Sequence, residues 1–193
     1  AAPKKVAVAV IGLGIIGSRA ATRLAEHHDV LTWNRTPKGR GDEVATVEEA
    51  TAAADIVLLY LKDSEAVREI AARIFALPPG KRTLVNHSTV DLETTHWLAD
   101  ECSKRGIDFL DCPFTGSRDA AAGGALVYYA GGPEEVVEHW EPLLLLTAKS
   151  VMRTGHAGTA TVLKLATNLV SACTVQALSE SLATATRHGV SAE

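Results

Sequence analysis

The chain has 193 residues, of which 47% are hydrophobic and 22% are charged, and its formal net charge is −4 at pH 7. This composition is typical of a globular protein that can bury one good core. The absence of a long basic run argues against a nucleic-acid partner, and the strand-sized length of the longest apolar runs argues against a membrane partner. Three cysteines without paired spacing, Cys102, Cys112 and Cys173, indicate free thiols in a reducing compartment, so we expect a cytoplasmic protein.

A nucleotide-binding pattern opens the chain. An apolar run over residues 6–11 predicts a buried parallel strand, residues 18–27 have the pattern of a helix, and residues 30–33 predict a second strand. Three glycines in GxGxxG spacing join the first strand to the helix. In such a loop they permit a tight turn, a close approach of the backbone to a pyrophosphate, and close packing of helix on strand. The predicted cofactor loop consists of Gly12, Leu13, Gly14, Ile15, Ile16 and Gly17.

The end of the second strand indicates which dinucleotide is bound. An NAD site usually has a carboxylate there, whereas an NADP site replaces it with an arginine that pairs with the 2′-phosphate. This chain has Asn34, Arg35 and Thr36, which favour NADP. The alternative interpretation is that Arg35 is an ordinary solvated arginine.

Beyond residue 36 the pattern alternates between strands and helices. Strands are expected at 56–61, 83–86, 107–110, 125–130 and 150–152, and helices at 46–53, 65–75, 91–105 and 134–146. Thr46 is the expected N-cap of the first of these helices, and Asp63 or Ser64 that of the second. The polar stretch after Arg35 has little room for the helix that often joins the second and third strands, and residues 120–125 have the composition of a flexible loop. The alternation predicts an α/β, Rossmann-type, doubly wound and mostly parallel sheet.

Right-handed crossovers place the loops that follow parallel strands on one edge of the sheet. Segments 12–17, 61–64, 86–89 and 112–118 should therefore converge there, where such folds bind ligands. The cofactor-binding candidates in the second and third of these segments are Leu61, Lys62, Ser88 and Thr89.

Residues 158–188 predict one long helix with more apolar surface than a single sheet contact needs. Lys164 and Asn168 are four residues apart and so share one face of it. A lysine in an apolar helix is either a side chain whose stem covers apolar surface or an ammonium placed for catalysis. The excess apolar surface predicts packing against another copy of the chain, as a homodimer or higher oligomer, or against a helical domain.

Four segments carry a resemblance to a known family. They are GLGIIG with WNRT, NHSTVD, FLDCPFTGSRDAAAGGAL and GHAGTATVLKLATN. Together they resemble the cofactor, nicotinamide-side, substrate and catalytic segments of the β-hydroxyacid dehydrogenases. That family includes 3-hydroxyisobutyrate dehydrogenases, glyoxylate and succinic semialdehyde reductases, and 6-phosphogluconate dehydrogenases.

The resemblance implies roles for particular residues. Lys164 and Asn168 occupy the catalytic positions, and Thr115, Gly116 and Ser117 occupy the substrate-binding segment. It also implies an NADP-binding Rossmann domain over residues 1–155. Residues 156–193 would then be the long interdomain helix that begins an all-helical C-terminal domain, otherwise absent from this chain.

The implied activity is NADP-dependent hydride transfer between nicotinamide and a short β-hydroxyacid or its semialdehyde, with a small carboxylate as substrate. Thr167 stands where 6-phosphogluconate dehydrogenases carry a histidine, which argues against that sugar-phosphate activity. Two alternatives remain open: an imine reductase of the same architecture, which Lys164 disfavours, and a non-catalytic NADP-binding scaffold. The histidines show no metal-ligand spacing, so no metal site is predicted.

Overall fold

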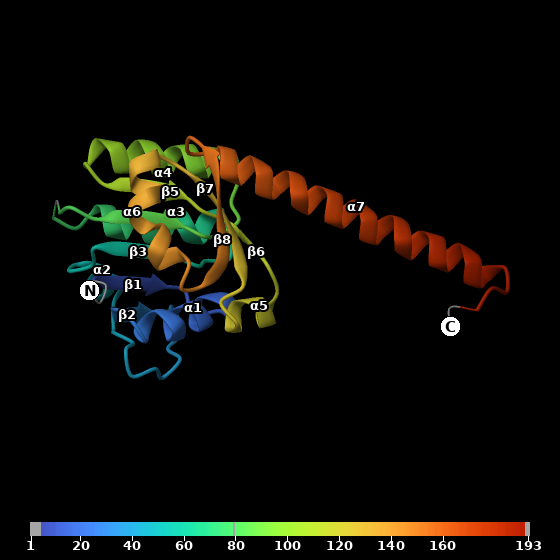
Figure 1. The fold of residues 1–193 in the computed structure, drawn as a ribbon, viewed down its shortest axis with the longest axis horizontal. Helices are drawn as coiled ribbons and strands as arrows, with labels where there is room; N and C mark the ends of the chain where they lie inside the picture. Colours follow the sequence, from blue (N-terminus) through green and yellow to red (C-terminus); the bar gives the residue numbers. More distant parts are fainter. Residues whose placement is uncertain (1–4, 79, 192–193) are drawn as a thin grey trace.

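The computed structural model describes residues 5–78 and 80–191. Residues 1–4 and 79 of the predicted cofactor domain, and residues 192–193 of the predicted helical part, therefore lie outside the described residues. Its centre is an eight-stranded sheet with the order β2-β1-β3-β4-β5-β7-β6, and β8 pairs with β7 (Figure 1). The strands are β1 (Ala7–Ile11), β2 (Asp29–Trp33), β3 (Ile56–Leu59), β4 (Thr83–Asn86), β5 (Asp108–Asp111), β6 (Phe114–Thr115), β7 (Leu126–Gly131) and β8 (Ala148–Gly155). The helices are α1 (Ile15–Ala25), α2 (Val47–Thr51), α3 (Ser64–Phe75), α4 (Leu92–Lys104), α5 (Arg118–Ala122), α6 (Glu134–Leu144) and α7 (Thr159–Arg187).

The first five strands run parallel to one another, and their loops therefore gather as predicted at one edge. β7 reverses direction against β5 and β6, and β8 then runs parallel to β7. The sheet is thus mostly parallel, which confirms the predicted fold class.

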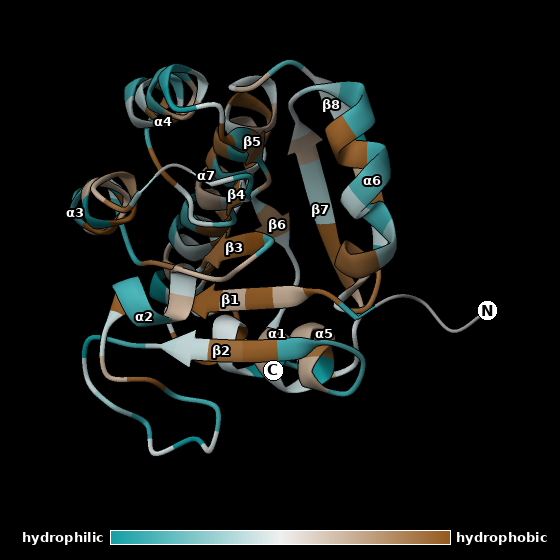
Figure 2. Cartoon of the chain, turned by 90° about the vertical axis from the view of Figure 1, so that its left-hand side faces the viewer, coloured by the Kyte–Doolittle hydropathy of each residue, from teal (hydrophilic) through white to brown (hydrophobic). Residues whose placement is uncertain are grey.

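The sheet is buried on both faces because successive side chains of each strand point in opposite directions. Val8 and Val10 join a core cluster with residues of α1, α5 and α6, whereas Ala9 and Ile11 join a second cluster with residues of α2, α3 and α4. Figure 2 shows α3 and α4 on the side of the sheet opposite to α6. This explains why β1 reads as a continuous apolar run instead of an alternating one.

Helix-start signals in the sequence correspond to the observed caps. The Thr46 hydroxyl accepts the Glu49 N–H at 3.1 Å, which confirms Thr46 as the cap of α2. Asp63, and not Ser64, caps α3 by accepting the Ala66 N–H at 2.9 Å. Such caps satisfy backbone donors that the first helical turn leaves unpaired.

The expectation of a flexible loop over residues 120–125 is partly wrong. Helix α5 covers Arg118–Ala122, and Ser117 caps it by accepting the Ala120 N–H at 3.2 Å. The two-residue strand β6 was also not predicted. β6 forms by antiparallel pairing with β7. A strand of two residues is too short to show an alternation of apolar and polar side chains in the sequence.

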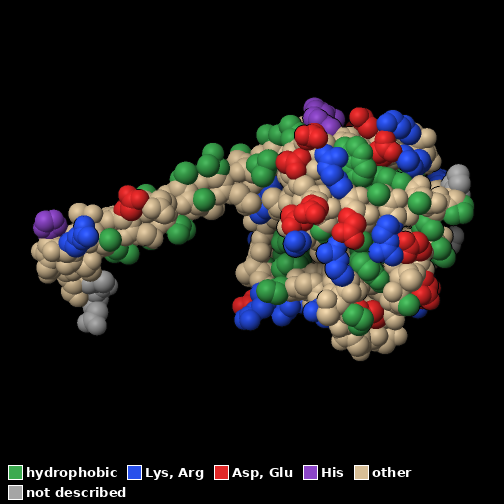
Figure 3. All heavy atoms as spheres, turned by 180° about the vertical axis from the view of Figure 1, so that it is seen from behind, with side chains coloured by type: hydrophobic (Ala, Val, Ile, Leu, Met, Phe, Trp, Pro, Cys, Tyr) green, Lys and Arg blue, Asp and Glu red, His purple; other side chains and the backbone are tan. Residues whose placement is uncertain are grey.

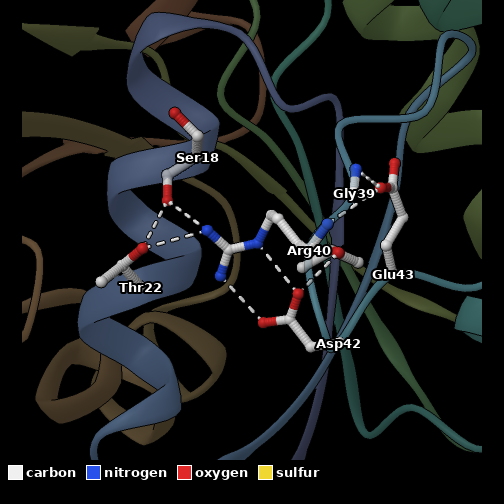
Figure 4. Close-up of polar contacts among 7 residues, drawn as sticks. Ser18, Thr22, Gly39, Arg40, Asp42 and Glu43 are labelled. Atoms are coloured by element: carbon white, nitrogen blue, oxygen red, sulfur yellow. Dashed lines mark hydrogen bonds and ion pairs between the residues drawn. The ribbon is translucent and has the colours of Figure 1, made fainter.

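No helix lies between β2 and α2 in the structure; the connection is a loop fastened to α1 (Figure 4). The Arg40 guanidinium donates to both carboxylate oxygens of Asp42, at 2.9 and 2.8 Å, and to the Thr22 hydroxyl at 3.0 Å. Burial alone would raise the pKa of Asp42, but hydrogen bonds from Arg40 and Thr32 lower it. Glu43 orders the tip of the loop by accepting backbone N–H groups, including that of Gly39. Helix α2 alone joins β2 to β3, and polar contacts hold the loop that precedes it against α1.

Helix α7 projects away from the body of the molecule (Figures 1 and 3). Of its described residues only Ala160 and Thr161 are buried. Its exposed large apolar side chains are Val162, Leu165, Leu169, Val170, Val175, Leu178 and Leu182. The predicted excess of apolar surface is thus present.

By length and composition α7 could also cross a membrane, because its most apolar 18-residue window has a mean hydropathy of 1.2. The expectation against a membrane partner rested on unbroken apolar runs, and it did not consider this helix, in which polar residues interrupt the apolar ones. Core helices of soluble proteins reach the same length and hydropathy.

Candidate cofactor and substrate site

The structure gives a different reason for the presence of glycine at each of the three glycine positions after β1. Gly12 has φ +98°, and a Cβ there would lie 2.2 Å from the Tyr60 carbonyl oxygen. A Cβ on Gly17 would lie 2.0 Å from the Gly12 carbonyl oxygen, so the start of α1 packs directly on the loop. Beside Gly14, by contrast, the position of a Cβ has no heavy atom within 4 Å. The loop is tight on its protein side and open where a phosphate would approach.

The N-terminus of α1 supplies donors to that open side. Gly14 is its N-cap and has no side chain to accept the N–H groups of the first turn. Those groups, on Ile15, Ile16 and Gly17, have no partner within the helix and are suited to bind an anion. These residues therefore fit a dinucleotide pyrophosphate.

Asn34 couples the glycine loop to the end of β2. Its Oδ1 accepts the Leu13 N–H at 2.8 Å, and its Nδ2 donates to the Thr36 carbonyl at 2.7 Å. The Asn34 side chain thus holds the glycine loop and the backbone of Thr36 together, and Arg35 lies between the two residues that make this contact. This contact was not predicted, since the sequence analysis took Asn34 only as a residue of the cofactor site.

A cavity of about 250 Å³ lies beside the loop. It is lined by Gly12, Gly14, Trp33, Asn34, Arg35, Tyr60, Leu61, Lys62, Ala66 and Ile70. Six of these ten lining residues are among the predicted cofactor residues. The ends of β1, β2 and β3 and one wall of α3 therefore enclose a space at the predicted place.

The end of β4 is tied to the end of β3 through Ser88. Its hydroxyl donates to the Leu59 carbonyl at 3.3 Å and accepts the Leu61 N–H at 2.8 Å. Ser88 is buried, whereas its neighbour Thr89 is exposed at the same edge. The structure thus gives Ser88 a role in shaping the edge and leaves Thr89 free to contact a ligand.

The predicted substrate segment follows β5. Thr115 is half-buried and pairs with Val127 of β7, while Gly116, with φ +139°, and Ser117 are exposed. The Ser117 oxygen accepts a backbone N–H as the cap of α5, so its own hydrogen remains available to a substrate oxygen. Within the described residues no hydrogen bond joins this segment to Lys164 or Asn168.

Asp111 holds the start of α7, a function that no local sequence pattern around this residue predicts. Its buried carboxylate accepts the Gly158 N–H at 3.0 Å, the Thr161 N–H at 2.8 Å and the Thr161 hydroxyl at 2.7 Å. Thr161 also exchanges a hydroxyl hydrogen bond of 2.8 Å with Thr95 of α4. Burial raises the pKa of Asp111, and these hydrogen bonds oppose the rise. The end of β5 therefore replaces the side-chain cap that Gly158 cannot provide.

Lys164 lies one helical turn beyond this anchor. It is half-buried, and in the described part of the chain its ammonium has neither an ion pair nor a hydrogen bond. Burial lowers the pKa of Lys164. Asn168, one turn further along, is exposed. An unpaired, partly desolvated ammonium one turn beyond the contact of α7 with the end of β5 is suited to stabilise a developing negative charge.

Two other groups near the edge are unsuited to acid–base chemistry. His87 is buried between the rings of Tyr60 and Tyr128, and burial lowers its pKa to about 3. It stays neutral near pH 7 and its Nδ1 donates to the Cys112 carbonyl at 2.7 Å. Burial raises the pKa of the Cys112 thiol well above its usual range, so this thiol is not an activated nucleophile. No group of three or more metal-ligating side chains occurs in the part of the chain that the structure describes.

Comparison with known proteins finds relatives over most of the chain. Residues 7–155 match the family described as the NAD binding domain of 6-phosphogluconate dehydrogenase. The chain is 29% identical over 190 residues to glyoxylate/succinic semialdehyde reductase 2 of Arabidopsis thaliana, covering 92% of this chain and 52% of that protein. It is 31% identical over 192 residues to 2-hydroxy-3-oxopropionate reductase of Escherichia coli, covering 93% and 65%. The chain thus spans about half to two thirds of these relatives.

Solved structures show the same architecture. A 3-hydroxyisobutyrate dehydrogenase of Mycobacterium tuberculosis, solved with L-serine, superposes with a TM-score of 0.88 at 25% identity, covering 98% of this chain and 68% of that one. An imine reductase of Myxococcus stipitatus reaches a TM-score of 0.87 at 19% identity, which shows a shared fold. The glycine loop, the mostly parallel sheet and the match over residues 7–155 lead to one conclusion: through its NAD-binding domain, the chain belongs to the β-hydroxyacid dehydrogenase family.

Proposed function

We propose that this protein is an NADP-dependent oxidoreductase that acts on a short β-hydroxyacid or the matching semialdehyde. The observation that carries the proposal is the half-buried, unpaired Lys164, fixed one turn from the anchor that joins α7 to the end of β5. The named relatives are a glyoxylate/succinic semialdehyde reductase and a 2-hydroxy-3-oxopropionate reductase, which supports this substrate class.

The bound nicotinamide would supply the hydride, and the residues of this chain orient the substrate and balance its charge. Backbone N–H groups and the hydroxyls of Thr115 and Ser117 would bind the substrate carboxylate. Lys164 would donate a proton or a hydrogen bond to the oxygen on which negative charge develops, and Asn168 would position that oxygen. One such contact at a developing charge is worth roughly 3–4 kcal/mol in a water-excluded site.

The substrate is tested by measuring turnover of glyoxylate, succinic semialdehyde and 3-hydroxyisobutyrate with each cofactor. We expect NADP-linked turnover of at least one of them. A cyclic imine serves as the comparison substrate, because solved imine reductases share the fold. Turnover of the imine alone would favour the imine reductase alternative, and cofactor binding without any turnover would favour the scaffold alternative.

Cofactor preference is tested at Arg35. We expect the wild-type chain to bind NADPH more tightly than NADH, and Arg35→Ala to weaken NADPH selectively, because a guanidinium forms two charge-assisted hydrogen bonds with a phosphate. The expected loss is about 10-fold, corresponding to hydrogen bonds between charged groups of at least 1.5 kcal/mol. Titration of both cofactors into both proteins measures it. Equal NADPH affinity in the two proteins would contradict the assignment.

We also propose that the exposed apolar side chains of α7 pack against a second copy of the chain. Burying such side chains is worth roughly 1.5–3 kcal/mol each, so several left in water favour association. Light scattering on the 193-residue chain should give a dimer or higher oligomer, and Val170→Glu together with Leu178→Glu should shift it to monomer. Leu145→Glu, at an exposed leucine beyond α6, is the control that should leave the oligomer intact. A wild-type monomer with a folded α7 would contradict this proposal.

A further inference from the structure

Arg35, on which the proposed preference for NADP rests, already has an anionic partner. Its guanidinium forms an ion pair with the carboxylate of Glu69 on α3. Both side chains are about half exposed, at 60% and 52%. The pair therefore lies where a ligand could reach it from solvent.

Arg35 lines the cavity beside the glycine loop, and Glu69 lies on α3, the helix that forms one wall of that cavity. Arg35 lines the cavity from the end of β2, and Ala66 and Ile70 line it from α3. Glu69 precedes Ile70 on the same helix. The ion pair thus joins the end of β2 to α3 at the place where the sequence predicts the 2′-phosphate.

Neighbouring cations do not take the place of Arg35 in an ion pair with Glu69, although the charge of Arg73 acts on Glu69 from a greater distance. Arg73, one turn further along α3, is held by both carboxylate oxygens of Glu48 at 2.7 Å. Lys62 pairs with Asp63 at 3.0 Å. Among the described residues Arg35 is the one ion-pair partner of Glu69.

We propose that Glu69 is a specificity-determining residue that competes with the cofactor 2′-phosphate for Arg35. The inference rests on the proposed binding of NADP. A carboxylate and a phosphate use the same N–H donors of a guanidinium, so one must displace the other or share it. A phosphate carries more negative charge than a carboxylate, so the 2′-phosphate displaces Glu69 from Arg35. Because this ion pair must first be broken, the phosphate binds less tightly than it would to an arginine without a partner. NADH has a neutral hydroxyl at this position, so Glu69 lowers the affinity for NADPH alone.

The test is Glu69→Gln, which keeps the size of the side chain and removes its charge. Glu69→Gln should tighten NADPH binding about two- to fivefold, the range for an exposed ion pair, and leave NADH binding unchanged. The gain should shrink at high salt, because exposed charges are screened. Glu65→Gln is the matched control, since it removes the same charge from an exposed position one turn earlier on α3. Calorimetric titration of NADPH and NADH into the 193-residue chain gives both dissociation constants.

The double variant separates competition from simple repulsion. In an Arg35→Ala background the effect of Glu69→Gln on NADPH should disappear, because no guanidinium remains to compete for. If Glu69→Gln tightens NADPH binding as much in the Arg35→Ala background as in the wild type, the inference is overturned. It is also overturned if Arg35→Ala weakens NADPH binding but Glu69→Gln alone leaves NADPH binding unchanged or weaker. If Arg35→Ala leaves NADPH binding unaltered, the NADP assignment itself fails, and the inference fails with it.

Discussion

Replacement of Lys164 by alanine is expected to lower kcat about 10²- to 10⁴-fold, the usual contribution of a positioned proton donor. The ammonium is half-buried and unpaired one turn beyond the contact of α7 with the end of β5, so its removal leaves the developing alkoxide without a nearby cation. Affinity for NADPH should change little, because the proposed role of Lys164 is toward the substrate. Steady-state kinetics with a substrate that the wild-type protein turns over, together with cofactor titration, measure both quantities.

The pH dependence has a defined sign. Donation of a proton in the reducing direction requires the charged ammonium, and burial lowers the pKa of Lys164. Reductive kcat should therefore fall as the pH rises through this lowered value. Lys149→Ala is the control, because Lys149 is an exposed lysine on β8. A Lys164→Ala enzyme with near wild-type turnover would show that this lysine merely covers apolar surface.

The second large effect is expected at Asp111. Asp111→Ala should lower the free energy of unfolding by about 2–4 kcal/mol, because it leaves the N–H groups of Gly158 and Thr161 unpaired in a buried place. Asp111→Asn should lower it by only about 1 kcal/mol, since the amide oxygen can still accept both N–H groups although the charge is lost. Urea denaturation measures the difference.

Hydrogen exchange locates the same effect in the molecule. The Thr161 amide should exchange faster in Asp111→Ala than in Asp111→Asn. Asp108→Ala, at an exposed position at the start of the same strand, should change the stability by no more than about 0.5 kcal/mol. Equal stability of Asp111→Ala and the wild type would show that the anchor contributes nothing to the attachment of α7.

The sequence predicts the elements whose signals are local. A continuous apolar run, glycine spacing and capping residues are all read over a few neighbours, and β4 and the cap at Thr46 lie where they are expected. The antiparallel pairing of β6 with β7 depends on chain folding back over about ten residues, so its two-residue strand has no periodicity to read.

The anchoring of α7 shows what remains invisible in a sequence read alone. Asp111 meets Thr161 across 50 residues, and Arg35 meets Glu69 across 34. The sequence around an aspartate looks the same whether its carboxylate is solvated or caps a helix that is distant in the chain. For Lys164 the sequence could place the residue on a helix face, but the partial burial that lowers its pKa depends on how that helix meets the body.

The distance of Lys164 from the anchor has a mechanical consequence. A helix of 29 residues extends about 43 Å, whereas Lys164 lies only about 8 Å from its first residue. If the helix tilts by about 5° around its fixed beginning, its tip sweeps through about 4 Å and the lysine moves by less than about 1 Å. The position of Lys164 is therefore largely independent of any movement at the far end of α7.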